Sequence, residues 1–370
     1  MDSSRVLGHV SEKKMNVRER FIATLTGKPI DRPPFIKVLG SGSEIVRAWE
    51  KQCPGLSGSF DQLLMFEGGS CGWRQAAVNV GISGRPANSS LTCADCIPNG
   101  ACSRGRGSFE TDNGPTCQYA VSSRDDWNRL RDMNMPADDP ARFPADWPFD
   151  VQRYSQRSYP LALVGGGVLR AARRLLGDER VLQLIEDDRS LLEDIINTQV
   201  ETMLGVWSKM ALGVQFDLID CWDDFHFTDT GPAPDDFFRR TVVPSYARIS
   251  DFARRNNIEV VLAGWHGKAE PIITLLQDAG VTALYPVETA AGNDVESIRA
   301  EHPSLGIVGG LDVRCLRGGQ KAAASELDKA ARMLAKGRYI PAFDCQPPPG
   351  VTWKSYREFM RSLQKLVLGA

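Results

Sequence analysis

The chain has 370 residues, of which 42% are hydrophobic and 24% are charged, and its formal net charge is −2. This is the composition of a globular protein with a large core, and a near-neutral charge without a long basic run argues against a nucleic-acid-binding surface. No apolar stretch approaches the ~20 residues that a membrane-spanning helix needs, and residues 1–15 lack the apolar region of a secretory signal.

The cysteine content and the N-terminus bear on location and organisation. Nine cysteines without a visible signal peptide indicate a reducing compartment, in which thiols serve as core residues or metal ligands. We therefore predict a cytoplasmic protein. We also predict a flexible tail over residues 1–15 and one domain over residues 16–370, with an irregular Cys- and Gly-rich excursion at about 66–120.

The first half of the chain shows few regular patterns. A helix is predicted from about Val17 to Leu25, followed by a Pro-rich stretch and the apolar segment Phe35–Leu39, a plausible first strand. Ser108–Ala120 contains Asp-Asn-Gly between strand-like flanks, which suggests a hairpin. Arg124–Arg157 is polar and rich in Pro and Trp, as in a surface excursion.

A strand over Leu161–Val164 then leads into three glycines, Gly165–Gly167, and into helices near Arg180–Ile185 and over Arg189–Ala211. Glycines after a strand favour a phosphate cradle. The dinucleotide-binding fingerprint is incomplete here, so this signal is weak.

The second half alternates short apolar strands with stretches of helical spacing. The strands are Leu218–Trp222, Val260–Trp265, Ala283–Pro286, Gly306–Gly310 and Tyr339–Phe343. The side chains that follow them are, in order, Asp223 and Asp224, His266, Glu288, Asp312, and Asp344 with Cys345. This alternation predicts an α/β fold with a parallel sheet, a (β/α)8 TIM barrel whose active site lies at the carboxyl ends of the strands.

Several motifs along the chain resemble the uroporphyrinogen decarboxylase-like superfamily. They are Arg18–Phe21, Pro29–Pro34, Asp125–Trp147, Gly231–Asp235, Pro244–Tyr246, Gly309–Asp312 and Gly337–Tyr356. The resemblance covers nearly the whole chain, is weakest from 40 to 120, and implies a (β/α)8 barrel and an expected homodimer. The decarboxylases themselves carry R-Q-A-G-R after the first strand, whereas Phe35–Gly42 has the single cation Lys37. A substrate with many carboxylates would need several clustered cations, so porphyrinogen decarboxylation is disfavoured, and Lys37 is left as a substrate-binding candidate.

The chain is more similar to the zinc-dependent methyltransferase branch, which moves methyl groups between corrinoid carriers and small thiols. That branch carries H-x-C after one strand and a later Cys before a Pro pair. His266 and Cys345 match this pattern, but Lys268 stands where the first Cys would be. The chain has no D-x-H-x-x-G segment, so any corrinoid would come on a partner protein.

A zinc site at His266 and Cys345 needs at least one more protein ligand. The candidates are Glu288, Asp224, Asp344 and His226. We predict zinc at His266, Cys345 and Glu288, because catalytic zinc takes imidazole, thiolate and carboxylate ligands and keeps one position open. A thiol substrate at that position would lose its proton and become a nucleophile. Without a metal, His266 would be a hydrogen-bonded histidine and Cys345 a buried thiol.

Other residues near the strand ends allow different chemistry. Asp224, Lys268 and Glu288 are candidate catalytic groups, and Lys268 could bind a substrate carboxylate or phosphate or form a Schiff base. The alternative function is therefore a decarboxylase or lyase acting on a small carboxylated metabolite. A barrel that binds ligand without catalysis is a third possibility. Trp222, Trp265 and Tyr285 either wall an apolar substrate pocket or belong to the core.

A second metal site is conceivable in the excursion. Four cysteines lie there within a short stretch, namely Cys93, Cys96, Cys102 and Cys117. Their spacing lacks the second C-x-x-C pair that structural zinc sites use, so an incidental or redox-active cluster is the stronger interpretation.

Overall fold

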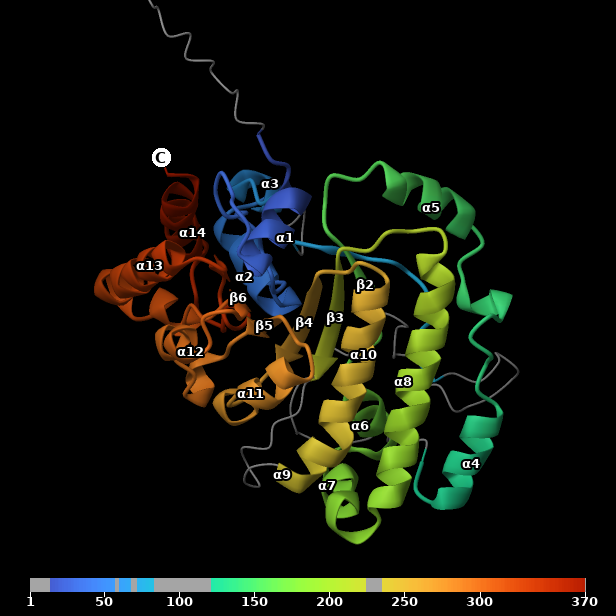
Figure 1. Cartoon of the computed structure of the whole chain (residues 1–370). Helices are drawn as coiled ribbons and strands as arrows, with labels where there is room; N and C mark the ends of the chain where they lie inside the picture. The colour runs from blue at the N-terminus through green and yellow to red at the C-terminus, as the bar shows by residue number, and fades with distance from the viewer. Residues whose placement is uncertain (1–13, 57–59, 68–71, 83–120, 224–234, 370) are drawn as a thin grey trace, which may run out of the picture.

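A computed structural model describes residues 14–56, 60–67, 72–82, 121–223 and 235–369. Its centre is a curled sheet of seven parallel strands that lie in chain order (Figure 1). The strands are β1 (Arg74–Gln75), β2 (Leu161–Val164), β3 (Leu218–Asp223), β4 (Val260–Trp265), β5 (Ala283–Pro286), β6 (Gly306–Val308) and β7 (Tyr339–Ile340). The five strands predicted in the second half of the sequence are confirmed, although β6 and β7 are shorter than expected.

Helices connect the strands and pack on the sheet. Before β1 lie α1 (Val17–Thr26), α2 (Ser43–Gln52) and α3 (Phe60–Leu64), and before β2 lie α4 (Arg124–Asp132), η1 (Pro140–Arg142) and α5 (Trp147–Ser155). Between β2 and β4 lie α6 (Arg170–Leu176), α7 (Asp178–Asp187), α8 (Arg189–Ala211), α9 (Asp235–Phe237), η2 (Phe238–Val242) and α10 (Val243–Arg255). The remaining helices are α11 (Glu270–Asp278), η3 (Thr289–Ala291), α12 (Val295–Glu301), η4 (Val313–Leu316), α13 (Gly319–Lys336) and α14 (Trp353–Leu368).

The alternation of side chains along the strands divides the core into two layers. Leu218, Val260 and Leu262 belong to an interior cluster on the concave side of the sheet. Their neighbours, such as Ile219 and Val261, pack between the sheet and its helices. This is the period-2 pattern of a strand that is buried on both faces.

Helix α1 covers the amino-terminal end of the sheet. Phe21 and Leu25 of α1 join the interior cluster, and the backbone of Leu25 lies against Gly306, the first residue of β6. A capping box between Asn16 and Glu19 begins this helix. The opposite, carboxyl-terminal end of the strands is the one left for a site.

The sheet does not close into the eight-stranded barrel that we predicted. Among the described residues it ends at β1 and β7, and the predicted first strand, Phe35–Leu39, is extended but is not part of the ladder. The backbone of Phe35 instead bonds with Glu67, whose side chain accepts from the Phe35 N–H at 2.8 Å and whose N–H donates to the Phe35 carbonyl. Pro33 and Pro34 offer no N–H to a neighbouring strand. Ile36 and Val38 still fill the interior, in the same cluster as β7.

No helix in the described ranges is long and apolar enough to cross a membrane. Several predictions fall outside these ranges. They concern residues 1–13 of the tail predicted over 1–15, the hairpin at 108–120, the four-cysteine group (Cys93, Cys96, Cys102 and Cys117), Asp224 and His226.

Candidate metal centre

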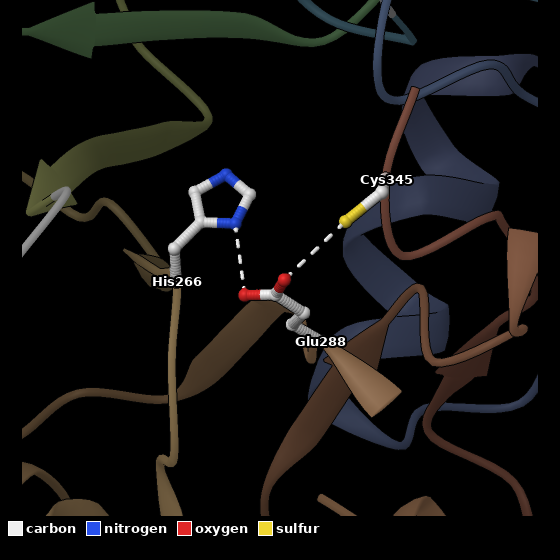
Figure 2. Close-up of side chains that lie close together, drawn as sticks. All are labelled: His266, Glu288 and Cys345. Atoms are coloured by element: carbon white, nitrogen blue, oxygen red, sulfur yellow. Dashed lines mark hydrogen bonds and ion pairs between the residues drawn. The ribbon is translucent and has the colours of Figure 1, made fainter. Parts of the chain in front are cut away.

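Three candidate ligands meet at the carboxyl-terminal edge of the sheet. His266 directly follows β4, Glu288 lies two residues beyond β5, and Cys345 lies in the loop after β7. One ligand atom from each lies within 4.8 Å of the other two, and Figure 2 shows the imidazole and the thiol on either side of the carboxylate. The structure thus brings together the three residues that the sequence predicted as metal ligands.

The distances are compatible with one shared metal ion. The His266 Nδ1 atom lies 3.5 Å from Glu288 Oε2, and the Cys345 Sγ atom lies 3.8 Å from Glu288 Oε1. Zinc bonds of about 2.0–2.3 Å in a tetrahedral arrangement separate the ligand atoms by roughly 3.3–3.8 Å. Glu288 is 5% exposed, and its Oε2 atom accepts a hydrogen bond from the Gly267 N–H at 3.1 Å. The carboxylate is therefore fixed by the loop that carries His266.

The backbone conformation after β5 explains why the Glu288 side chain points toward His266 and Cys345. Strict alternation would place Glu288 on the same face as Leu284, which packs against the helices. Val287, however, has φ 57° and packs in the layer between sheet and helices itself. This left-handed residue reverses the order of the faces and turns Glu288 toward His266. A β-branched residue rarely adopts a positive φ.

An aromatic cluster, formed by Trp222, Tyr285 and Trp73, lies beside the His266 imidazole. The ring of Trp222, from β3, meets the ring of His266 edge-on with centroids 4.9 Å apart. Tyr285, from β5, meets Trp222 at 4.9 Å and Trp73 at 5.3 Å. The predicted candidates Trp222 and Tyr285 thus lie together next to the proposed ligands. Trp222 is the one of these two that is partly exposed.

Asp220 is a buried carboxylate that contacts Tyr285 and Trp73 of this aromatic cluster. It is not among the site residues predicted from the sequence. It accepts hydrogen bonds from the Tyr285 hydroxyl and from the Trp73 indole N–H, the latter at 3.0 Å. Burial raises the pKa of Asp220 above its ordinary value, although both hydrogen bonds oppose this shift. A signal was present in the sequence, because Asp220 shares the inward face of β3 with Leu218 and Trp222.

Asp223 faces away from the ligands. Its carboxylate accepts from the backbone N–H groups of Val168, Leu169 and Arg170, and from the Tyr246 hydroxyl at 2.6 Å. The N–H groups of the three residues that follow the glycines are therefore bound by a carboxylate, which occupies the place where an anion would bind. This finding argues against the phosphate cradle.

Asp344, considered as a ligand, is engaged elsewhere. It is 1% exposed, and both of its oxygen atoms accept hydrogen bonds, from Thr289 and from the Val313 N–H. Asp312 pairs with Arg314 in its own turn. Neither belongs to the group formed by His266, Glu288 and Cys345.

Three other residues were predicted to be catalytic or to bind substrate, namely Lys268, Trp265 and Lys37. Lys268 is two residues past His266, is 49% exposed and forms an ion pair with Glu270 at 3.5 Å. Trp265 packs against Phe238 between the sheet and the helices, because β4 alternates and His266 takes the other face. Lys37 is buried in the extended segment whose inward face carries Ile36 and Val38. These positions do not support a substrate contact for Trp265 or Lys37.

No protein-family model matches this sequence, and a search of curated proteins finds no match. Among solved structures, the chain is similar to a methyltransferase from Methanosarcina mazei, with a TM-score of 0.60 and 16% identity over 95% of this chain and 99% of the other. A methionine synthase-like protein from Listeria monocytogenes, of the vitamin-B12-independent type, matches with a TM-score of 0.35 and 12% identity over 59% of this chain and 69% of the other. The first likeness shows that the chain has the fold of that methyltransferase, and the resemblance expected from the sequence is confirmed at this level.

Proposed function

We propose that the protein is a methyltransferase-like enzyme that acts on a small molecule, with a zinc ion held by His266, Glu288 and Cys345. The observation that carries this proposal is a nitrogen, an oxygen and a sulfur ligand atom within 4.8 Å of one another at the carboxyl ends of the strands. In parallel α/β folds this is the end that carries active sites. The fold shared with a methyltransferase supports the reaction class by analogy.

The chain's own residues fit this role. Three protein ligands leave one position of a tetrahedral zinc open, and zinc bound there would supply the Lewis acidity that converts a substrate thiol to a thiolate near neutral pH. Trp222 packs on His266 and restricts the rotation of the imidazole. Lys268 is half exposed two residues after His266 and pairs with Glu270, and in this proposal its ammonium group also binds an anionic group of the substrate. In this proposal the methyl group is carried by a corrinoid on a partner protein.

The structure gives less support to the alternative, a decarboxylase or lyase that uses Lys268. A Schiff base needs an amine shielded from water, whereas the Lys268 side chain is half exposed and pairs with Glu270. No observation on the described residues favours loss of carbon dioxide.

The first test is elemental analysis of the purified protein beside the variants His266→Ala and Cys345→Ala. We expect about one zinc per chain in the wild type and loss of the metal in both variants, because each removes one of only three protein ligands. Matched controls are His302→Ala and Cys53→Ala, which change the same residue types outside the proposed site. Both controls should keep the metal.

Two results would contradict the proposal. Zinc kept in His266→Ala and Cys345→Ala but lost when Cys93 and Cys96 are replaced would assign the metal to the four-cysteine group. A metal-free protein that retains methyl-transfer activity would rule out zinc-dependent activation of the thiol.

A further inference from the structure

The three proposed ligands come from three separate loops. His266 lies in the loop after β4, Glu288 in the loop after β5 and Cys345 in the loop after β7. A metal binds tightly only when such loops already hold their ligand atoms near the bonded geometry. The contacts that join these loops therefore decide how well the site is formed before any metal arrives.

The side chain of Asn293 joins the first two loops. It is 5% exposed and lies between η3 and α12. Its Nδ2 atom donates to the carbonyl of Gly267 at 2.8 Å and to the carbonyl of Glu288 at 2.7 Å, while its Oδ1 atom accepts from the Ala269 N–H at 2.8 Å. Both N–H groups of the amide and its carbonyl oxygen are thus used, and a buried amide with these partners has one orientation. Asn293 fixes the backbone of Glu288 against the residues on either side of Lys268.

The side chain of Asp344 joins the second and third loops. Its Oδ2 atom accepts from the Thr289 N–H at 2.8 Å and from the Thr289 hydroxyl at 2.6 Å, and its Oδ1 atom accepts from the Val313 N–H at 3.1 Å. Thr289 directly follows Glu288, and Asp344 directly precedes Cys345. The carboxylate therefore sets the distance between the loop of Glu288 and the loop of Cys345.

A disfavoured backbone conformation directly precedes the residues that make these contacts. Val287 has φ 57°, and such a residue keeps a positive φ only when its surroundings hold it there. The next two residues are Glu288, whose carbonyl accepts from Asn293, and Thr289, whose N–H donates to Asp344. The two side chains bind the chain immediately after the turn that directs Glu288 into the site.

We propose that Asn293 and Asp344 are positioning residues that hold the three ligand-bearing loops together, so that His266, Glu288 and Cys345 meet a metal ion without rearrangement. The inference rests on the proposed zinc site. Neither side chain would be a ligand of that metal, because the polar atoms of both are bound to backbone groups or to Thr289.

The test measures metal affinity in the full-length protein, with Zn²⁺ titrated against a chromophoric chelator and Co²⁺ used as a spectroscopic substitute. The variants are Asn293→Ala, Asn293→Ser and Asp344→Asn. We expect Asn293→Ala and Asp344→Asn to bind Zn²⁺ about 10–100-fold more weakly than the wild type, as found when groups that orient metal ligands are removed. Asn293→Ser keeps a shorter polar group and should fall between them and the wild type. The Co²⁺ absorption spectrum should change in shape, because the ligand geometry changes.

Asp217→Asn is the matched control. Asp217 is also a buried carboxylate that joins separate segments, since it accepts from Arg18 at 2.8 Å, Arg157 at 2.9 Å and the Leu161 N–H at 2.9 Å. It lies at the amino-terminal end of β3, the far end of the sheet from the ligands. This variant should lower the urea midpoint of the metal-free protein and leave the Zn²⁺ affinity and the Co²⁺ spectrum unchanged.

The outcomes separate this inference from the proposed function. Wild-type protein that binds Zn²⁺, together with Asn293→Ala and Asp344→Asn variants of equal affinity and unchanged Co²⁺ spectrum, would overturn the positioning role and leave the zinc site standing. Wild-type protein that binds no Zn²⁺ would overturn both. Weaker binding in Asp217→Asn equal to that in Asp344→Asn would show that loss of stability alone explains the effect, which also overturns the positioning role.

Discussion

Glu288 and Asp220 are two of the buried carboxylates near the carboxyl-terminal ends of the strands, and their partners give them different roles. Glu288 faces an imidazole and a thiol, which are potential metal ligands. Asp220 accepts hydrogen bonds from the Tyr285 hydroxyl and the Trp73 indole N–H, and neither of these groups is among the usual zinc ligands. At the scale of the residue, the neighbours of each carboxylate therefore decide its chemistry more than its burial does.

The raised pKa of Asp220 predicts how stability depends on pH. Because burial makes the folded state bind this proton more tightly than the unfolded state does, stability falls as pH rises from about 4 through the raised pKa. The slope contributed by this group reaches at most about 1.4 kcal/mol per pH unit. Asn cannot titrate, so Asp220→Asn should gain stability relative to the wild type as pH rises.

Urea unfolding of the wild type and of Asp220→Asn between pH 4 and pH 8 measures this difference. A difference in unfolding free energy that stays constant across the range would show that the pKa of Asp220 is not raised by burial. The comparison uses only the change of this difference with pH, so a constant offset in stability between the two proteins does not affect it.

At the scale of the element, β4 has a glycine, Gly264, at the point where the rings of Trp222 and Tyr285 pack across the strand. A Cβ atom on Gly264 would lie 2.5 Å from Trp222 Cε3 and 2.8 Å from Tyr285 Cε1. The missing side chain lets both rings lie over the strand two residues before His266, on the same face of β4. Since Trp222 in turn packs on His266, the strand and the orientation of the ligand depend on this position.

Gly264→Ala should therefore destabilise the protein by about 1–3 kcal/mol, the usual effect of overpacking, and should weaken Zn²⁺ binding through displacement of Trp222. Urea unfolding and the chelator titration measure the two effects. Gly40→Ala is the control, because a Cβ atom there meets no atom within 4 Å. Equal stability of the two variants would mean that the rings move aside without cost.

Many of the helices and strands were predicted from the sequence. Strands β4 and β5 and helix α8 have the predicted bounds, because apolar runs between Gly, Pro and polar residues leave few alternatives. His266, Glu288 and Cys345 were predicted from their places after strand ends, and for His266 and Cys345 also from the family resemblance. The role of Asn293 could not be predicted, because all its partners lie on loops whose approach is set by the tertiary fold. The open sheet was also missed, since the bond between Phe35 and Glu67 depends on residues far apart in the sequence.

At the scale of the whole molecule, an ion network holds the extended segment Phe35–Leu39. Ile36 of this segment lies against Gly72, shortly before β1, and shares the interior cluster with Ile340 of β7. Arg20 of α1 is 3% exposed and bonds with Asp31 at 2.6 Å and with Glu67 at 2.9 Å. Arg32 bonds with Glu67 at 2.7 Å, and Glu67 accepts from the Phe35 N–H. Glu67 thus joins α1 to this segment.

Glu67→Gln should lower the unfolding free energy at pH 7 by about 2 kcal/mol, because hydrogen bonds to a charged group are each worth about 1.5–3 kcal/mol and the uncharged amide keeps some of them. Burial raises the pKa of Glu67, but its bonds with Arg32 and Phe35 outweigh this and bring the pKa below its ordinary value. This contribution is therefore present above pH ~4.3 and is lost as pH falls through the lowered pKa.

Urea unfolding at pH 7 and pH 3 is the measurement, and Glu259→Gln is the control. Glu259 pairs with Lys28, but both side chains are about half exposed, so its loss should have an effect below about 1 kcal/mol. Zinc content should be unchanged in both variants, since the network lies at the end of the sheet that α1 covers. A Glu67→Gln protein as stable as Glu259→Gln would mean that the interior contacts of Ile36 and Val38 hold the segment without help from the ion network.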